Sequence, residues 1–173
     1  MRVVTETAVR LALAFDARQS QKEGAMARHM AWSTYGDLLL LAHDEHRPTD
    51  DEWRSWLRAY ETRSPRIRGV LVRSLGGGPS SSQRKELVEA MEAQTIRTPT
   101  AILTSSAIAR GVLTALSWFL SAERLPRTFT LDDVVAALTF LGVDAASEGG
   151  VRAELARLAG SLDLPARRAA GGA

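Results

Sequence analysis

A β-branched strand segment that runs into a glycine-rich loop and then an amphipathic helix constrains this chain most. Residues 67–92 read IRGVLVRSLGGGPSSSQRKELVEAME, so Val70 and Val72 precede three glycines, a proline and three serines. Glycines remove Cβ groups from the loop, and the start of a helix presents unsatisfied backbone N–H groups. The segment therefore predicts a concave site between strand and helix, with backbone N–H groups that face an anion or an acidic partner.

The alternation of strand and helix patterns continues along the chain. Strand patterns occur at residues 30–42 (a hairpin with Gly36-Asp37 as its turn), 67–75, 100–103 and 127–130. Helix patterns separate these segments, and parallel strands need such crossover connections. We therefore predict an α/β fold: a mostly parallel sheet of about five strands with an N-terminal antiparallel hairpin strand, helices packed on the sheet, and an extra C-terminal helix.

Apolar periodicity and capping residues locate the helices. Thr49 and Glu52 have the spacing of a capping box, and a stripe with helical spacing follows: Trp53, Trp56, Leu57 and Tyr60. This stripe predicts core packing rather than a ligand cage. Three later helices have apolar stripes of their own: Ile108, Val112, Leu116 and Phe119; Val134, Leu138 and Leu141; and Val151, Leu155, Leu158 and Leu162.

Composition narrows the class of protein. A hydrophobic content of 45% and a charged content of 24% are ordinary for a globular protein. The absence of cysteine excludes a disulfide framework, a thiolate metal site and a thiol nucleophile. A net charge of +2 without a basic, aromatic-interleaved stripe argues against nucleic acid as a partner. No apolar segment is long enough for an integral membrane span, so we expect a cytoplasmic bacterial-type protein.

The chain divides into three parts. We expect residues 1–25 to form an N-terminal extension, residues 26–143 the domain, and residues 144–173 a C-terminal helix followed by a disordered tail. Lys22-Glu23-Gly24 can be encoded by a purine-rich ribosome-binding sequence just before Met26, so one hypothesis is that residues 1–25 are a mis-annotated start. The alternative is a true amphipathic arm, since apolar residues alternate in it.

The order of elements, with a serine-rich loop between the third strand and its helix, resembles the STAS family, which includes anti-sigma-factor antagonists and sulfate-transporter tails. Residues 127–141, RTFTLDDVVAALTFL, resemble the end of that fold, and the similarity covers residues 30–143. It implies a non-enzymatic regulatory or scaffold module. Its partner would be another protein: a regulatory kinase, an anti-sigma-like factor or a scaffold.

The resemblance also implies a docking loop. STAS antagonists typically carry Asp-Ser-Ser/Thr-Gly at this helix start, where the partner kinase phosphorylates a serine. The matching loop here lacks the acidic residue and the final glycine, and its candidate binding residues are Gly76, Gly77, Gly78, Ser80, Ser81 and Ser82. Phosphorylation of one of the three serines is the predicted modulation. Simple N-capping by Ser80, with Gln83 at capping-box spacing, is an alternative that is compatible with docking.

A second functional class is a carrier of a small apolar ligand, a lipid or an anion. Four residues are secondary candidates for anion contacts: Arg84, Arg110, Ser105 and Ser106. An enclosed apolar cavity beneath the helices favours the carrier, whereas solid packing with exposed apolar area near the glycine loop favours docking.

Enzymatic, cofactor and metal functions rank lowest. The chain has no Gly-Lys-Ser/Thr at the end of its glycine loop and no Gly-x-Ser-x-Gly elbow. Two histidines and two carboxylates occur together in His43-Asp44-Glu45-His46. A strand end points His43 and His46 to opposite sides and His29 is isolated, so we predict a solvated polar loop, no metal and no cofactor.

Overall fold

The computed structural model describes residues 28–94, 97–107, 111, 114 and 125–162. One sheet has its strands in the order β1-β2-β3-β4-β5. The strands are β1 (Met30–Tyr35), β2 (Leu38–His43), β3 (Gly69–Ser74), β4 (Thr100–Thr104) and β5 (Arg127–Phe129). β1 pairs with β2 in antiparallel fashion, and every other pairing is parallel. The predicted α/β fold with its hairpin strand is therefore confirmed.

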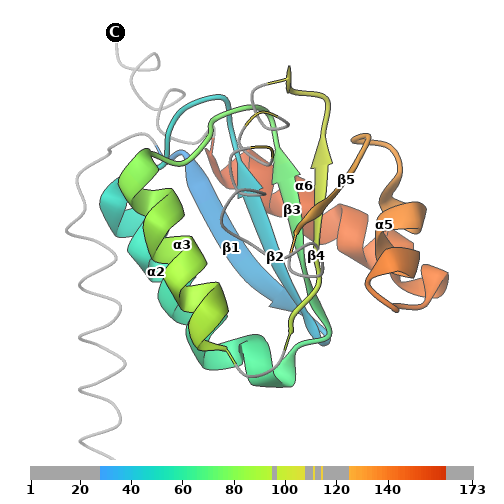
Figure 1. The fold of residues 1–173 in the computed structure, drawn as a ribbon. Coiled ribbons are helices and arrows are strands. Elements are labelled where there is room, and N and C mark those ends of the chain that lie inside the picture. The colour runs from blue at the N-terminus through green and yellow to red at the C-terminus, as the bar shows by residue number, and fades with distance from the viewer. Residues whose placement is uncertain (1–27, 95–96, 108–110, 112–113, 115–124, 163–173) are drawn as a thin grey trace, which may run out of the picture.

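Helices cover both faces of the sheet, which gives three layers (Figure 1). α2 (Asp50–Arg63) and α3 (Ser81–Ala93) pack on one face, and α5 (Val134–Phe140) and α6 (Glu148–Leu162) on the other. Short 3-10 turns, η1 (Ser64–Arg66) and η3 (Ala145–Ser147), follow α2 and precede α6. Because both faces of β2 are covered, its run of leucines from 38 to 41 is buried throughout, as in other parallel sheets.

The hairpin turn fixes the register of the first two strands. Gly36 has a φ of +56°, a left-handed conformation that glycine adopts without steric cost. Tyr35 pairs with Leu38 next to the turn, and Met30 pairs with His43 at the far end. The backbone N–H of Asp44 then donates to the carbonyl oxygen of His29 at 3.1 Å, so the pairing extends one residue beyond the strands.

Both predicted capping boxes are present. The Thr49 side chain accepts from the backbone N–H of Glu52, and that of Ser80 from the backbone N–H of Gln83. Gln83 is buried, and its Nε2 donates to Pro48 O at 3.1 Å and to Asp50 Oδ1 at 2.9 Å. The start of α3 is thereby joined to the start of α2.

Several predicted segments lie outside the described residues. They are the N-terminal extension, the apolar stripe at Ile108, Val112, Leu116 and Phe119, and the C-terminal tail beyond Leu162. The predicted C-terminal helix is α6, and it packs on β1 and β2. Among the described helices, none has the length and apolar character needed to cross a lipid bilayer.

Candidate functional site

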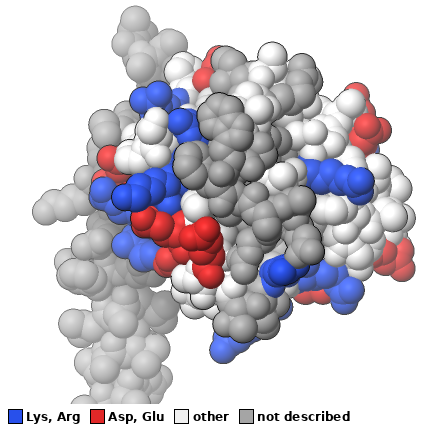
Figure 2. Space-filling view, in the orientation of Figure 1, with Lys and Arg blue, Asp and Glu red and all other residues white. Residues whose placement is uncertain are grey.

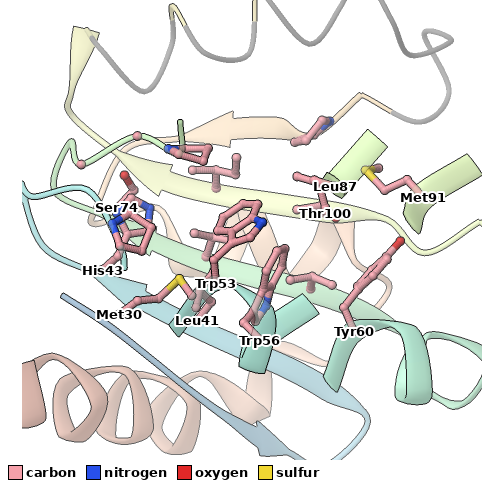
Figure 3. Close-up of a pocket in the computed structure, with 18 residues that line it drawn as sticks. Met30, Leu41, His43, Trp53, Trp56, Tyr60, Ser74, Leu87, Met91 and Thr100 are labelled. Atoms are coloured by element: carbon pink, nitrogen blue, oxygen red, sulfur yellow. The ribbon is translucent and has the colours of Figure 1, made fainter. Parts of the chain in front are cut away.

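A cavity of about 100 Å³ lies between the sheet and the α2–α3 layer (Figure 3). Its walls come from all of the strands β1 to β4, from α2 and α3, and from the glycine loop. Apolar side chains such as Leu41, Val72 and Ile102 form its sheet side, and Leu87 and Met91 come from α3. A volume of this size holds a molecule on the scale of a single small ring.

Three polar atoms with no hydrogen-bond partner belong to residues that line this cavity. They are Trp53 Nε1, Trp56 Nε1 and Ser74 Oγ. The residues Trp53, Trp56 and Ser74 are only 4%, 4% and 2% exposed. A buried polar group without a partner costs about 1–3 kcal/mol, so each of these three atoms is a hydrogen-bonding group whose partner is still to be identified.

The two tryptophans follow each other on the inner side of α2, with ring centroids 5.0 Å apart. Their predicted burial is confirmed, but they line a cavity as well as packing in the core. Figure 3 shows His43 and Ser74 at one end of the cavity and Tyr60 and Met91 at the other. The cavity therefore has a polar end at the carboxyl edge of β2 and β3, where His43 and Ser74 are paired in the sheet register.

His43 is a neutral member of this polar end. Burial lowers the pKa of His43 below its ordinary value, although the contacts with Asp44 oppose this shift. Its Nδ1 lies 3.3 Å from the carbonyl oxygen of Asp44. A carbonyl only accepts hydrogen bonds, so Nδ1 carries the proton and Nε2 is the acceptor.

The interior of the cavity and the outer surface differ in charge. Among the described lining residues there is no Lys, Arg, Asp or Glu. On the outside of the molecule, acidic and basic side chains lie close together on the face drawn in Figure 2. On α3, for example, Lys85 Nζ and Glu89 Oε1 are 3.7 Å apart. The cavity thus suits a molecule without net charge.

The glycine loop packs against the connection between β2 and α2. The Gly77 N–H donates to the carbonyl oxygen of Asp44 at 3.0 Å, and a Cβ atom on Gly77 would overlap the main chain of His46. Gly76 has a φ of +133°, and its Cβ would lie 2.9 Å from Ser106 Oγ. Gly76 and Gly77 are buried. The expectation that the loop's N–H groups face outward is therefore wrong at Gly77, because its amide bonds inward to the neighbouring connection.

The later part of the loop divides between the cavity and the surface. Gly77, Gly78 and Pro79 line the cavity, while Ser81 and Ser82 are exposed at the start of α3. Ser80 Oγ and Ser82 Oγ are 2.8 Å apart.

Of the four residues predicted as secondary anion contacts, Arg84 is the one that the structure shows in contact with the serines at the start of α3. Its guanidinium donates to Pro79 O at 2.9 Å and to Ser81 Oγ at 3.0 Å. Ser106 lies against Gly76, Ser105 is exposed after β4, and Arg110 is outside the described residues.

A second polar cluster forms beside the β2–α2 connection. His29 Nδ1 and His46 Nδ1 lie 3.0 and 3.2 Å from the same oxygen, Asp44 Oδ2. Burial alone would raise the pKa of Asp44, but the hydrogen bonds with His29 and His46 outweigh burial and lower this pKa. His29 is therefore not isolated, and His46 joins this cluster while His43 lines the cavity. The hairpin register contains the signal that sequence reasoning missed, since it places His29 opposite Asp44.

Comparison of the chain with known proteins identifies no relative. No protein-family model, curated protein or solved structure matches the chain.

Proposed function

We propose that this protein binds a small, neutral, mainly apolar molecule in the cavity between the sheet and the α2–α3 layer. The observation that carries the proposal is the set of unpartnered buried atoms, Trp53 Nε1, Trp56 Nε1 and Ser74 Oγ, on residues lining an otherwise apolar space. Ligand sites commonly combine apolar walls with a few convergent polar groups. This is the carrier function that the sequence left open beside docking.

The polar groups define the chemical class of the ligand. An indole N–H only donates, so the tryptophans require a hydrogen-bond acceptor such as a ketone, ester or amide oxygen. A free carboxylate is disfavoured, because burial of a charge without a cationic partner is costly. Neutral His43 and the Ser74 hydroxyl add a second polar contact at the other end of the ligand.

The test uses two rings of similar size that differ in one acceptor oxygen: cyclohexanone and cyclohexane. The measurement is the indole N–H resonances of Trp53 and Trp56 in ¹⁵N-labelled protein during titration, with affinities expected on the order of millimolar. Cyclohexanone should shift both resonances in the direction of a new hydrogen bond, and cyclohexane should produce a smaller change.

A matched pair of variants locates the binding site. Val72 lines the cavity and is 7% exposed, so Val72→Phe should fill the space and abolish binding. Val135 on α5 is 41% exposed, so Val135→Phe should bind cyclohexanone as the wild type does. If neither compound shifts the two indole resonances, or if Val72→Phe binds as well as the wild type, the cavity is not a ligand site.

Protein docking is the second candidate, as the STAS resemblance predicts. The observation that favours it is Leu75, a 39% exposed apolar side chain next to the glycine loop. A phosphate on Ser81 would gain a charge-assisted hydrogen bond from Arg84, whose Nη2 lies 3.0 Å from Ser81 Oγ.

The docking test compares proteins recovered with wild type, Ser81→Asp and Leu75→Asp. Docking requires a partner that Leu75→Asp loses, and the charge switch requires that Ser81→Asp changes its recovery. The same partners recovered equally with all three would rule out this function for the loop.

A further inference from the structure

We propose that His29, Asp44 and His46 form a binding site for a divalent transition-metal ion such as Zn²⁺. One ligand atom from each of the three residues lies within 4.8 Å of the other two. Two imidazole nitrogens and one carboxylate oxygen are a ligand set suited to zinc, cobalt, nickel or copper, whereas magnesium and calcium prefer oxygen ligands.

The distances between the ligand atoms fit such an ion. Bonds of about 2.0–2.2 Å in a tetrahedral geometry separate two ligand atoms by roughly 3.3–3.6 Å. The Nδ1 atoms of His29 and His46 lie 3.0 and 3.2 Å from Asp44 Oδ2. An ion can therefore replace the protons that these groups share, with adjustment of the two exposed or half-buried imidazoles, whose ligand atoms lie within 4.8 Å of each other.

The carboxylate is already oriented for this role. The backbone N–H of His46 donates to Asp44 Oδ1 at 2.7 Å, which leaves Oδ2 directed toward the two histidines. Hydrogen bonds of this kind to the oxygen that does not ligate the metal orient carboxylates in metal sites.

The main chain that presents the three ligands is held from both sides. The Asp44 N–H donates to the His29 carbonyl oxygen at 3.1 Å, and the Asp44 carbonyl oxygen accepts from Gly77 at 3.0 Å. The backbone N–H of His29 donates to Glu52 Oε1 at 2.8 Å, which ties this ligand to the first turn of α2. Such preorganisation reduces the entropy lost when an ion binds.

An ion can reach the site from solvent. The side chain of His46 is 61% exposed, while those of His29 and Asp44 are 23% and 22% exposed. Three protein ligands leave one tetrahedral position for water or another ligand. The competing interpretation is a hydrogen-bonded cluster that stabilises the β2–α2 connection and binds no metal.

The test uses untagged, metal-free protein, because an affinity tag of histidines would bind the same ions. Isothermal titration with Zn²⁺ should give one ion per chain, and Co²⁺ should produce the visible absorption bands of a low-symmetry site. His29→Gln and His46→Gln should each weaken Zn²⁺ binding by about tenfold or more. Mg²⁺ should show no binding under the same conditions.

Glu45→Gln is the matched control, because Glu45 is an exposed carboxylate beside His46 and outside the cluster. It should bind Zn²⁺ as tightly as the wild type. Circular dichroism and thermal unfolding of each variant separate loss of the site from loss of the fold, and His46→Gln changes an exposed side chain. The proposal is overturned if the wild type does not bind Zn²⁺ stoichiometrically, or if both histidine variants bind Zn²⁺ as tightly as the wild type. In either case the three residues form only a hydrogen-bonded cluster.

Discussion

Gly77 lies so close to His46 that a Cβ atom on Gly77 would overlap the His46 backbone carbonyl oxygen. The glycine loop and the β2–α2 connection therefore contact each other through their main chains. Any side chain at position 77 must separate them and break the bond from Gly77 N–H to Asp44 O. We expect Gly77→Ala to lower the free energy of unfolding by about 2–3 kcal/mol in chemical denaturation.

Gly160→Ala is the control for this prediction. Gly160 lies within α6, and no atom lies within 4 Å of the position that its Cβ would occupy. Alanine in a helix is more favourable than glycine, so this variant should gain about 0.5–1 kcal/mol. A Gly77→Ala variant as stable as the wild type would show that the two loops do not pack closely.

Two buried serines predict opposite responses to the same substitution. Ser64 is fully buried and its Oγ donates to Gln94 Oε1 at 2.6 Å, whereas Ser74 is 2% exposed and its Oγ has no partner. Ser64→Ala should lower the free energy of unfolding by about 1–3 kcal/mol, because it removes the buried hydrogen bond from Ser64 Oγ to Gln94 Oε1. Ser74→Ala should leave stability unchanged or raise it by about 1 kcal/mol, because it removes an unsatisfied hydroxyl.

Equilibrium unfolding of both variants checks this pair. A loss in Ser74→Ala as large as that in Ser64→Ala would mean that the Ser74 hydroxyl makes a hydrogen bond in the folded protein. The Ser74 hydroxyl would then not be available to hydrogen-bond a ligand at the polar end of the cavity.

The layered architecture could be predicted because local and long-range signals agree. The turn at Gly36-Asp37 and the run of leucines that follows it specify a hairpin leading into a buried strand. The capping boxes at Thr49 and Ser80 mark the first residues of two helices. Parallel strands need a crossover connection of a dozen or more residues, and the helix patterns between the later strands supply it, so parallel pairing is the favoured prediction.

The candidate sites could be predicted less well, for two physical reasons. A stripe such as Trp53 and Trp56 predicts burial, but a cavity depends on how side chains from six elements fill the space between them. To predict the cluster of His29, Asp44 and His46, the pairing of the hairpin had to be extended one residue beyond β1 and β2, which places His29 opposite Asp44. The inward-facing amide of Gly77 depends on contact with a connection more than thirty residues earlier, which no local pattern encodes.

Ser80 and Ser81 are adjacent, but their contacts predict different roles: Ser80 caps α3, whereas Ser81 is available for recognition. Ser80 Oγ accepts from the Gln83 backbone N–H at 3.1 Å, whereas exposed Ser81 contacts the side chain of Arg84. Ser80→Ala should lower the free energy of unfolding by about 1 kcal/mol, and Ser81→Ala should change it by less than about 0.5 kcal/mol. Thermal and urea unfolding measure both, and equal losses would argue against a distinct capping role for Ser80.

The ion pair between Glu154 and Arg157 on α6 predicts a dependence of stability on acid pH. The Arg157 side chain donates to both carboxylate oxygens, at 2.8 and 2.6 Å. This pair, together with a weaker contribution from the Ser33 hydroxyl, lowers the pKa of Glu154 from 4.5 to about 2. Because the folded pKa is the lower one, the carboxylate stabilises the fold above the unfolded pKa of 4.5. This contribution is lost as the pH falls toward 2.

The difference in unfolding free energy between wild type and Glu154→Gln should therefore shrink as the pH falls across this range. The change should be smaller at high salt, because the pair is on the surface. In an Arg157→Gln background the pH dependence of this difference should largely disappear. A difference that is unchanged by pH in the wild-type background would show that the pair does not form in solution.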